Sequence, residues 1–305
     1  MRVRNVGSSE LVVSLVGLGC NNFGFRIDAD QARVVVDAAI DDGITLFDTA
    51  ESYGDGKSEE YLGRALGARR AGVLIATKFG WGRGRDDHSI ARGSPKYVRN
   101  AIEGSLRRLG TDYVDLYQYH RPDGVTPIEE TLGAMHELVE AGKVRYIGSS
   151  NLSAAQVREA DAVARERGLT RFVSAQNEYS WLERDPEAEL IPACAELGIG
   201  LIPYFPLASG LLTGKYRRGE AAPEGTRLEG RLDDADARWE KVEALEAFAA
   251  AHGRTLLDVA IGGLAAEPAI ASVIAGATRP EQVHANVAAG EWTPSADELT
   301  ELRSL

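Results

Sequence analysis

Eight short apolar segments, each followed by sequence with helical periodicity, constrain the fold of this 305-residue chain more than any other feature. The strand-like segments are 15–18, 44–47, 73–77, 113–117, 144–148, 172–176, 199–202 and 270–274. Strands that alternate with helices predict a parallel sheet covered by helices, because each parallel connection must cross over the sheet. Eight such units in a chain of this length predict closure into an α/β barrel, the (β/α)8 or TIM barrel.

The segments between these strands carry helix start and stop signals. Asp28 or Asp30 can cap a helix that ends at Gly43, and Ser153 can cap another that runs to Arg167. Further helices are expected at 58–69, 94–109, 127–141, 187–197, 234–252, 255–266 and 280–289, the last of them being the final regular helix. Ahead of all these elements, 2–4 and 11–14 predict an N-terminal β-hairpin.

An open, doubly wound sheet is the alternative fold. It would need a phosphate-binding GxGxxG fingerprint between an early strand and a helix. Residues 17–24 have the wrong glycine spacing, and the glycines of 80–84 lie in a loop that no helix directly follows. We therefore expect one barrel domain over residues 1–305. Its long loops, 79–93 and 204–233, leave the C-terminal face, where the active sites of barrels are built.

Charge and composition argue against several classes of protein. The 34 basic and 46 acidic residues give a net charge of −12, which disfavours an extended nucleic-acid surface. Two distant cysteines and unpaired histidines give no metal-site spacing. No apolar run approaches the ~20 residues of a membrane span, and the first residues lack a signal-peptide pattern. We expect a soluble, cytoplasmic protein that acts on a small molecule, with no nucleic-acid or membrane partner; its oligomeric state stays open.

Polar residues follow three neighbouring strand segments. Asp48 follows the second, Lys78 follows the third and His120 lies just beyond the fourth, while Tyr53 is in the same loop as Asp48. Strand ends of a barrel meet at one mouth, so these four side chains are expected to lie together. Taken singly, a structural Asp48–Lys78 ion pair and a capping role for His120 are the simpler interpretations. Their joint placement favours an active site.

This set of side chains suits proton transfer to a carbonyl oxygen. A lysine ammonium stabilises a phenolate, so we expect Lys78 to lower the pKa of Tyr53 and make it a better general acid. Asp48 would hold the lysine, and His120 can donate a hydrogen bond to the carbonyl. None of the four can supply a hydride, so a reductase would need a cofactor.

Seven ordered segments carry a family resemblance: 47–63, 77–80, 116–123, 147–151, 176–180, 204–216 and 275–286. Together they resemble the aldo-keto reductases over nearly the whole chain. The resemblance implies a (β/α)8 barrel that reduces aldehydes or ketones with NADPH. It also implies that Tyr53 is the general acid, that His120 orients the carbonyl, and that Lys78 with Asp48 tunes the tyrosine.

The same resemblance implies the cofactor site. The nicotinamide amide would be held by Ser150, Asn151 and Gln176, and the nicotinamide ring would stack on Tyr204. The pyrophosphate would lie against Leu207, Ser209 and Leu211. The adenosine end would be held by Gly276, Thr278, Arg279, Gln282 and Asn286. A helix start at 278–281 is also a natural anion site, although a plain Thr278 cap would explain the same pattern. Arg279 could grip a 2′-phosphate, which favours NADP(H), with NAD(H) still possible.

Other features leave alternatives open. Phe23, Trp81 and Trp181 are candidates for an apolar substrate wall, and packing is the competing interpretation. Phe205 stands where the family usually has serine. Two rival functions remain: a regulatory NADP-binding subunit with little turnover, because the family includes regulators of channels, and a barrel lyase that uses Lys78 as a Schiff-base amine.

Overall fold

The computed structural model describes residues 1–81, 91–233 and 237–305, and its main sheet holds eight parallel strands in the order β10-β3-β4-β5-β6-β7-β8-β9. These strands are β3 (Val16–Gly19), β4 (Leu46–Asp48), β5 (Leu74–Phe79), β6 (Val114–Tyr119), β7 (Val144–Ser150), β8 (Phe172–Gln176), β9 (Gly200–Leu201) and β10 (Val273–Gly276). Leu201 of β9 pairs with Ile270, just before β10, and this bridge joins the two edges of the sheet. The predicted (β/α)8 barrel is thereby confirmed.

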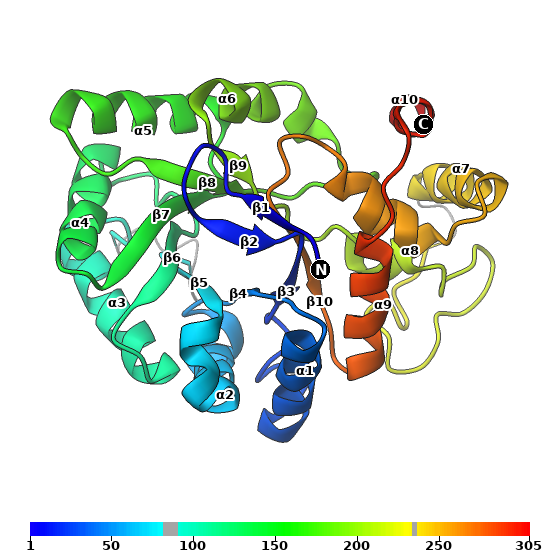
Figure 1. The fold of residues 1–305 in the computed structure, drawn as a ribbon, viewed down its shortest axis with the longest axis horizontal. Coiled ribbons are helices and arrows are strands. Elements are labelled where there is room, and N and C mark those ends of the chain that lie inside the picture. Colours follow the sequence, from blue (N-terminus) through cyan, green and yellow to red (C-terminus); the bar gives the residue numbers. More distant parts are fainter. Residues whose placement is uncertain (82–90, 234–236) are drawn as a thin grey trace.

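Helices lie around the outside of the strands (Figure 1). They are α1 (Ala29–Asp41), α2 (Lys57–Leu66), α3 (Pro95–Leu109), α4 (Ile128–Glu140), α5 (Ala154–Arg167), α6 (Leu190–Leu197), α7 (Arg238–Ala251), α8 (Leu256–Asp258), α9 (Pro280–Gly290) and α10 (Ala296–Ser304). Shorter helical turns are η1 (Tyr53–Gly56), η2 (Gly67–Gly72), η3 (Asp185–Glu187), η4 (Ala208–Thr213) and the π-helical turn η5 (Val259–Gly263). Among the helices of the described residues, none is long and apolar enough to cross a membrane.

The helix starts follow the signals in the sequence. The Asp28 carboxylate accepts hydrogen bonds from the backbone N–H groups of Asp30 and Gln31, and the Gln31 side chain accepts one from the Asp28 N–H. Ser153 and Gln156 form the same reciprocal arrangement at α5. Such capping boxes satisfy N–H groups that have no partner within the helix.

Three helical predictions differ most from the structure. The helix expected at 280–289 is not the last, because Ser295 and Glu298 form a capping box that starts α10. The helix expected at 255–266 widens into η5, where Gly262 lies so close to α9 that a Cβ would be 2.6 Å from the Ala289 carbonyl oxygen. Helix α7 begins at Arg238 rather than at 234; residues 234–236, like 82–90 of the first long loop, lie outside the described residues.

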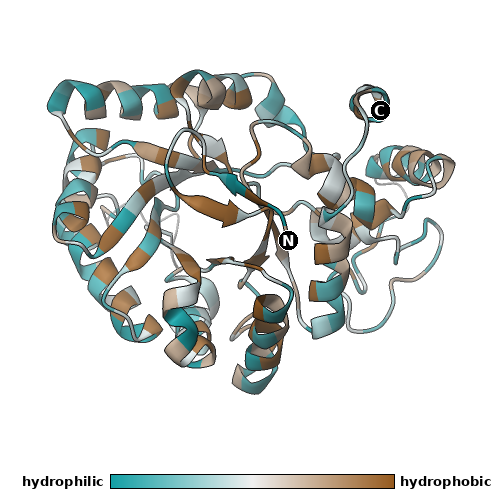
Figure 2. Ribbon diagram, viewed as in Figure 1, coloured by the Kyte–Doolittle hydropathy of each residue, from teal (hydrophilic) through white to brown (hydrophobic). Residues whose placement is uncertain are grey.

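The predicted hairpin, β1 (Val3–Asn5) with β2 (Val12–Ser14), lies across one end of the barrel in Figure 1. Its side chains Val6, Leu11 and Val13 are buried against a cluster inside the barrel that includes Leu116 and Ile202. A larger apolar cluster fills the layer between strands and helices, and the brown strands and teal outer helix faces in Figure 2 show this division. Since the hairpin covers the N-terminal end, the site can open only at the C-terminal end of the strands.

Candidate active site

The four candidate catalytic residues come from three adjacent strand ends, as predicted. Asp48 is the last residue of β4, and Tyr53 starts the turn η1 that follows. Lys78 lies within β5, one residue before its end, rather than after the strand. His120 follows β6 directly, and its N–H donates to the Phe79 carbonyl of β5. Strand pairing therefore fixes where three of these residues sit relative to one another.

The Lys78 ammonium is the centre of the set. Its Nζ lies 2.6 Å from Asp48 Oδ1, donates to the Thr49 carbonyl oxygen at 2.8 Å, and lies 3.4 Å from the Tyr53 hydroxyl. Lys78 and Asp48 are both buried. Burial lowers the pKa of Lys78, but its interactions with Asp48 and Tyr53 outweigh that effect and leave the pKa above the ordinary value. The lysine therefore stays charged beside the tyrosine hydroxyl.

The net pKa of Tyr53 differs from the prediction. Burial raises the pKa of the Tyr53 phenol, the Lys78 ammonium lowers it, Asp48 raises it, and the balance lies above the ordinary value of 10.0. The expected effect of Lys78 is present, but it is smaller than the effect of burial. Removal from water destabilises the phenolate more than the Lys78 ammonium stabilises it. Tyr53 consequently holds its proton firmly at neutral pH.

His120 faces the same space as a neutral ring. Burial, with the nearby charges of Lys78 and Arg121, holds the pKa of His120 well below 6.5. Its ring centre lies 5.8 Å from that of Tyr53 and 4.6 Å from that of Trp81, edge-on in both cases. The buried Nδ1 has no hydrogen-bond partner among the described residues. A neutral imidazole keeps one N–H that can donate to a ligand.

A cavity of about 1,010 Å³ opens above these residues. Most of the predicted site residues line it: Asp48, Tyr53, Trp81, His120, Ser150, Asn151, Gln176, Tyr204, Leu207, Ser209, Gly276, Thr278, Arg279, Gln282 and Asn286. Lys78 and Leu211 are buried behind this wall. Phe23 and Trp181 do not line it, contrary to prediction: Phe23 is fully buried, and the indole N–H of Trp181 donates to the Val259 carbonyl in the core.

The side chains that are predicted to hold the nicotinamide form hydrogen bonds with one another in this structure. The Tyr204 hydroxyl donates to Asn151 Oδ1 at 2.8 Å, and Asn151 Nδ2 donates to the His120 carbonyl and to Ser150 Oγ. Gln176 Nε2 donates to Asp48 Oδ2 at 2.9 Å. These bonds tie the ends of β7, β8 and β9 to the catalytic set, so amide and hydroxyl groups are already oriented beside it.

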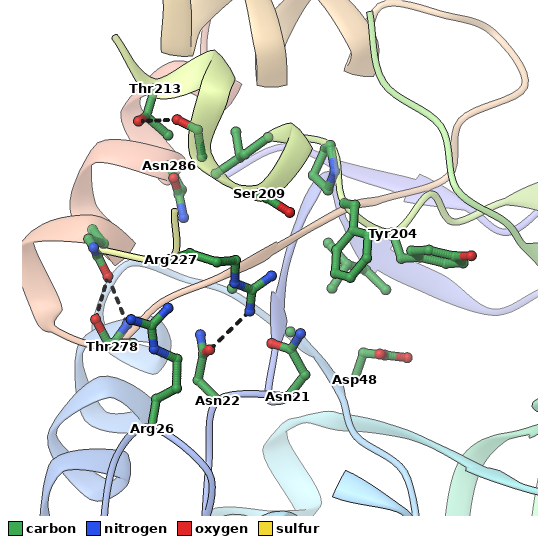
Figure 3. Close-up of a pocket in the computed structure, with 18 of the residues that line it drawn as sticks. Asn21, Asn22, Arg26, Asp48, Tyr204, Ser209, Thr213, Arg227, Thr278 and Asn286 are labelled. Carbon is green, nitrogen blue, oxygen red and sulfur yellow. Dashed lines mark hydrogen bonds between the residues drawn. The ribbon is translucent and has the colours of Figure 1, made fainter. Parts of the chain in front are cut away.

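Two arginines at another part of the cavity have no counterpart among the predicted site residues. Arg227 donates to Asn22 Oδ1 at 3.3 Å, and Arg26 donates to the Gly225 carbonyl at 2.9 Å. Figure 3 shows both guanidinium groups in the space beside Thr278. Burial and the like charge of Arg26 lower the pKa of Arg227. No sequence spacing marks this pair, because its members lie on loops far apart in the chain.

The start of α9 is open to an anion. Its first residues have no side-chain cap, and Thr278 donates through both its N–H and its hydroxyl to Gln282 Oε1 instead of capping the helix. Free N–H groups at such a start favour negative charge. Arg279 is well exposed there, with its Nε 3.8 Å from Glu281.

The segment after Tyr204 has an unusual backbone. Phe205, Ala208 and Ser209 have φ values of 55°, 45° and 59°, in the left-handed region that non-glycine residues seldom adopt. Phe205 lines the cavity, and the Arg227 guanidinium carbon lies 5.6 Å from its ring centre. Strained backbone of this kind gathers at ligand-binding segments, where the surroundings hold it.

Comparison with known proteins identifies the family. The sequence profile of the Aldo/keto reductase family matches residues 15–305. The chain belongs to the aldo-keto reductase family. A probable voltage-gated potassium channel subunit beta is 37% identical in Oryza sativa subsp. japonica and 39% identical in Arabidopsis thaliana, each over 96% of this chain and 92% of the relative. The uncharacterized oxidoreductase YrpG of Bacillus subtilis is 36% identical over 95% of this chain and 91% of its own length. Two of these relatives are thus named as channel subunits, and the third is named as an oxidoreductase.

Proposed function

We propose that this protein reduces an aldehyde or ketone to an alcohol with NADPH, reversibly, with Tyr53 as general acid and base. One observation carries the proposal: the Lys78 ammonium lies 2.6 Å from Asp48 and 3.4 Å from the Tyr53 hydroxyl, which lines a cavity together with His120. This arrangement serves a proton donor whose conjugate base must be stabilised at the moment of transfer.

Each residue has a distinct part in the proposed reaction. Tyr53, whose pKa is raised by burial, carries its proton to the reaction and donates it to the carbonyl oxygen. The phenolate left behind is stabilised by the Lys78 ammonium, which Asp48 holds in place. The neutral His120 ring donates a hydrogen bond that orients the same oxygen. Alcohol oxidation uses the same groups in reverse, with Tyr53 accepting the proton.

NADPH supplies the hydride that none of these side chains can provide. The cavity fits it in size and charge: about 1,010 Å³ is at the upper end of ligand sites, and Arg26 and Arg227 approach each other without an ion-paired carboxylate among the described residues. Phosphates would neutralise this pair and the start of α9.

In the proposal, the nicotinamide half lies against Ser150, Asn151, Gln176 and Tyr204, the pyrophosphate against the 207–211 segment, and the adenosine end against Gly276, Thr278, Gln282 and Asn286. Arg279 favours the 2′-phosphate of NADP(H) over NAD(H).

Burial of Lys78 weighs against the lyase alternative. A Schiff base needs an uncharged amine that a substrate can reach, whereas Lys78 is fully buried, ion-paired with Asp48 and raised in pKa. The names of the two plant relatives favour a different second candidate, a cofactor-binding subunit that regulates a partner protein with little turnover. Turnover separates that candidate from the reductase.

Tyr53→Phe tests the reductase function. The variant keeps the ring and removes only the hydroxyl, so we expect reduction of a reactive aromatic aldehyde to fall at least about 100-fold, the contribution of a general acid. NADPH absorbance follows the reaction, and titration with NADPH and with NADH, read by protein fluorescence, shows that the cofactor still binds. Wild-type turnover in the variant would show that Tyr53 is not the acid. No turnover by the wild type, with NADPH bound, would favour the regulatory subunit.

A further inference from the structure

We propose that Arg121 makes this site selective for carbonyl substrates that also carry a carboxylate. The inference rests on the reductase function proposed above and names the substrate class of the same cavity. It is carried by the position of Arg121 relative to His120 and Trp81, and by the charges around it.

Arg121 lies on the wall of the same cavity as the reacting groups. It follows His120 in the chain, and both residues line the cavity. Its guanidinium carbon is 5.7 Å from the centre of the Trp81 ring, which is itself 4.6 Å from the centre of the His120 ring. The guanidinium can therefore be no farther from the imidazole than the sum of these two distances. A carbonyl held by Tyr53 and His120, with a flat spacer beside Trp81, places its far substituent within reach of Arg121.

The charges at this part of the cavity leave Arg121 available to an anion. The Asp48 carboxylate is already paired with Lys78, and Arg121 forms no ion pair with any carboxylate in the described parts of the chain. Glu178 also lines the cavity, but it is not in ion-pair contact with Arg121, and burial together with Glu183 raises its pKa. The side chain of Arg121 is exposed, so pairing with a ligand costs little desolvation.

Arginine suits this role because its planar guanidinium can form two parallel hydrogen bonds to one carboxylate. A charged, two-fold hydrogen bond of this kind discriminates between ligands by about tenfold to hundredfold. We therefore expect kcat/KM for a carboxylate-bearing aldehyde to exceed that for its neutral analogue by such a factor.

The test compares 4-carboxybenzaldehyde with 4-methylbenzaldehyde, two substrates of similar shape, in the presence of NADPH. The measured quantity is the ratio of their kcat/KM values within each protein. We expect the wild-type ratio of at least about tenfold to fall to about one in Arg121→Met and below one in Arg121→Glu. Arg158→Met removes an exposed arginine of α5 that pairs with Glu196 outside the cavity, and it serves as the matched control that keeps the wild-type ratio.

Two results would overturn the inference while the reductase function stands: a wild-type ratio near one, or an unchanged ratio in Arg121→Met. If neither aldehyde is reduced, the proposed reductase function is wrong. The role of Arg121 in selecting carboxylates is then tested by ligand binding alone. Titration of the wild type and Arg121→Met with 4-carboxybenzyl alcohol and 4-methylbenzyl alcohol, read by tryptophan fluorescence with NADP⁺ present, then supports it only if the wild type prefers the carboxylate and the variant does not. Equal binding of both alcohols overturns it.

Discussion

Tyr53 and His120 face one cavity with opposite changes in pKa. Burial disfavours the charged form of each, which raises the pKa of the phenol and lowers that of the imidazole. Both groups are therefore neutral over a wide range of pH, and both keep a proton that can be donated. That range is the one in which the proposed reduction can proceed.

The first prediction concerns the pH dependence of reduction. The reaction needs Tyr53 protonated and His120 neutral, so kcat/KM should stay level through pH 6.5, the ordinary pKa of histidine, and fall only above pH 10.0, the ordinary value for tyrosine. Alcohol oxidation, which needs the phenolate, should instead rise as the pH rises. Initial rates from acid to alkaline pH, with samples returned to neutral pH to confirm recovery, measure both limbs. A step centred near pH 6.5 in reduction would contradict the assignment of a neutral, buried His120.

At this scale the sequence indicated which residues meet, but not how their energies balance. Strand ends brought Asp48, Lys78 and His120 together because parallel strands align their carboxyl ends. The net pKa of Tyr53 depends on burial, which no spacing reports. Burial also explains why the prediction for Trp181 is wrong. An aromatic residue in a loop can face either the core or the cavity, and the packing around Trp181 turns it toward the core, where its indole N–H donates to the Val259 carbonyl.

At the scale of elements, α2 shows how closely the outer helices of the barrel pack. Gly63 lies where α2 meets the C-terminal end of α3, and a Cβ there would be 2.3 Å from the Leu109 carbonyl oxygen. Backbone atoms cannot rotate away from such a contact. Helix α4 carries the opposite case, Gly133, where a Cβ would meet no atom within 4 Å. Local pattern predicted both helices, whereas the different roles of the two glycines follow only from the packing.

These two glycines form a matched pair for the second prediction. Gly63→Ala should lower the free energy of unfolding by about 1–3 kcal/mol through overpacking. Gly133→Ala should raise it by up to about 1 kcal/mol, because alanine has the higher helix propensity. Urea denaturation followed by circular dichroism measures both. If Gly63→Ala is as stable as Gly133→Ala, the close packing of α2 on α3 is wrong.

At the scale of the whole molecule, the hairpin at one end of the barrel is attached to the last strands of the sheet. Gly7, in its turn, has a φ of 58° and lies so close to the α6–β9 connection that a Cβ would be 2.1 Å from the Gly198 carbonyl oxygen. Arg4 donates to the carbonyl of Ile270, the residue that pairs with β9. The hairpin therefore supports the strands at which the sheet closes.

The third prediction isolates this contact. Gly7→Ala and Gly142→Ala both place alanine at a positive φ, 58° and 71°, but a Cβ at Gly142 would meet nothing within 4 Å. Each variant loses about 1–2 kcal/mol from the left-handed backbone, and Gly7→Ala should lose about 1–3 kcal/mol more from the clash. Thermal unfolding of both variants measures the difference. Equal melting temperatures would show that the hairpin turn does not pack against the barrel as described.

The closure between β9 and β10 has a consequence for ligand binding. Strand β9 has only two residues, and a single bridge from Leu201 to Ile270 joins it to the other edge of the sheet. The loop after β9 and the segment after β10 both line the cavity. A dinucleotide that touched both would connect the two edges of the sheet at the point where the barrel closes. Its binding would therefore stabilise the closed barrel against separation of β9 from β10, in addition to filling the site.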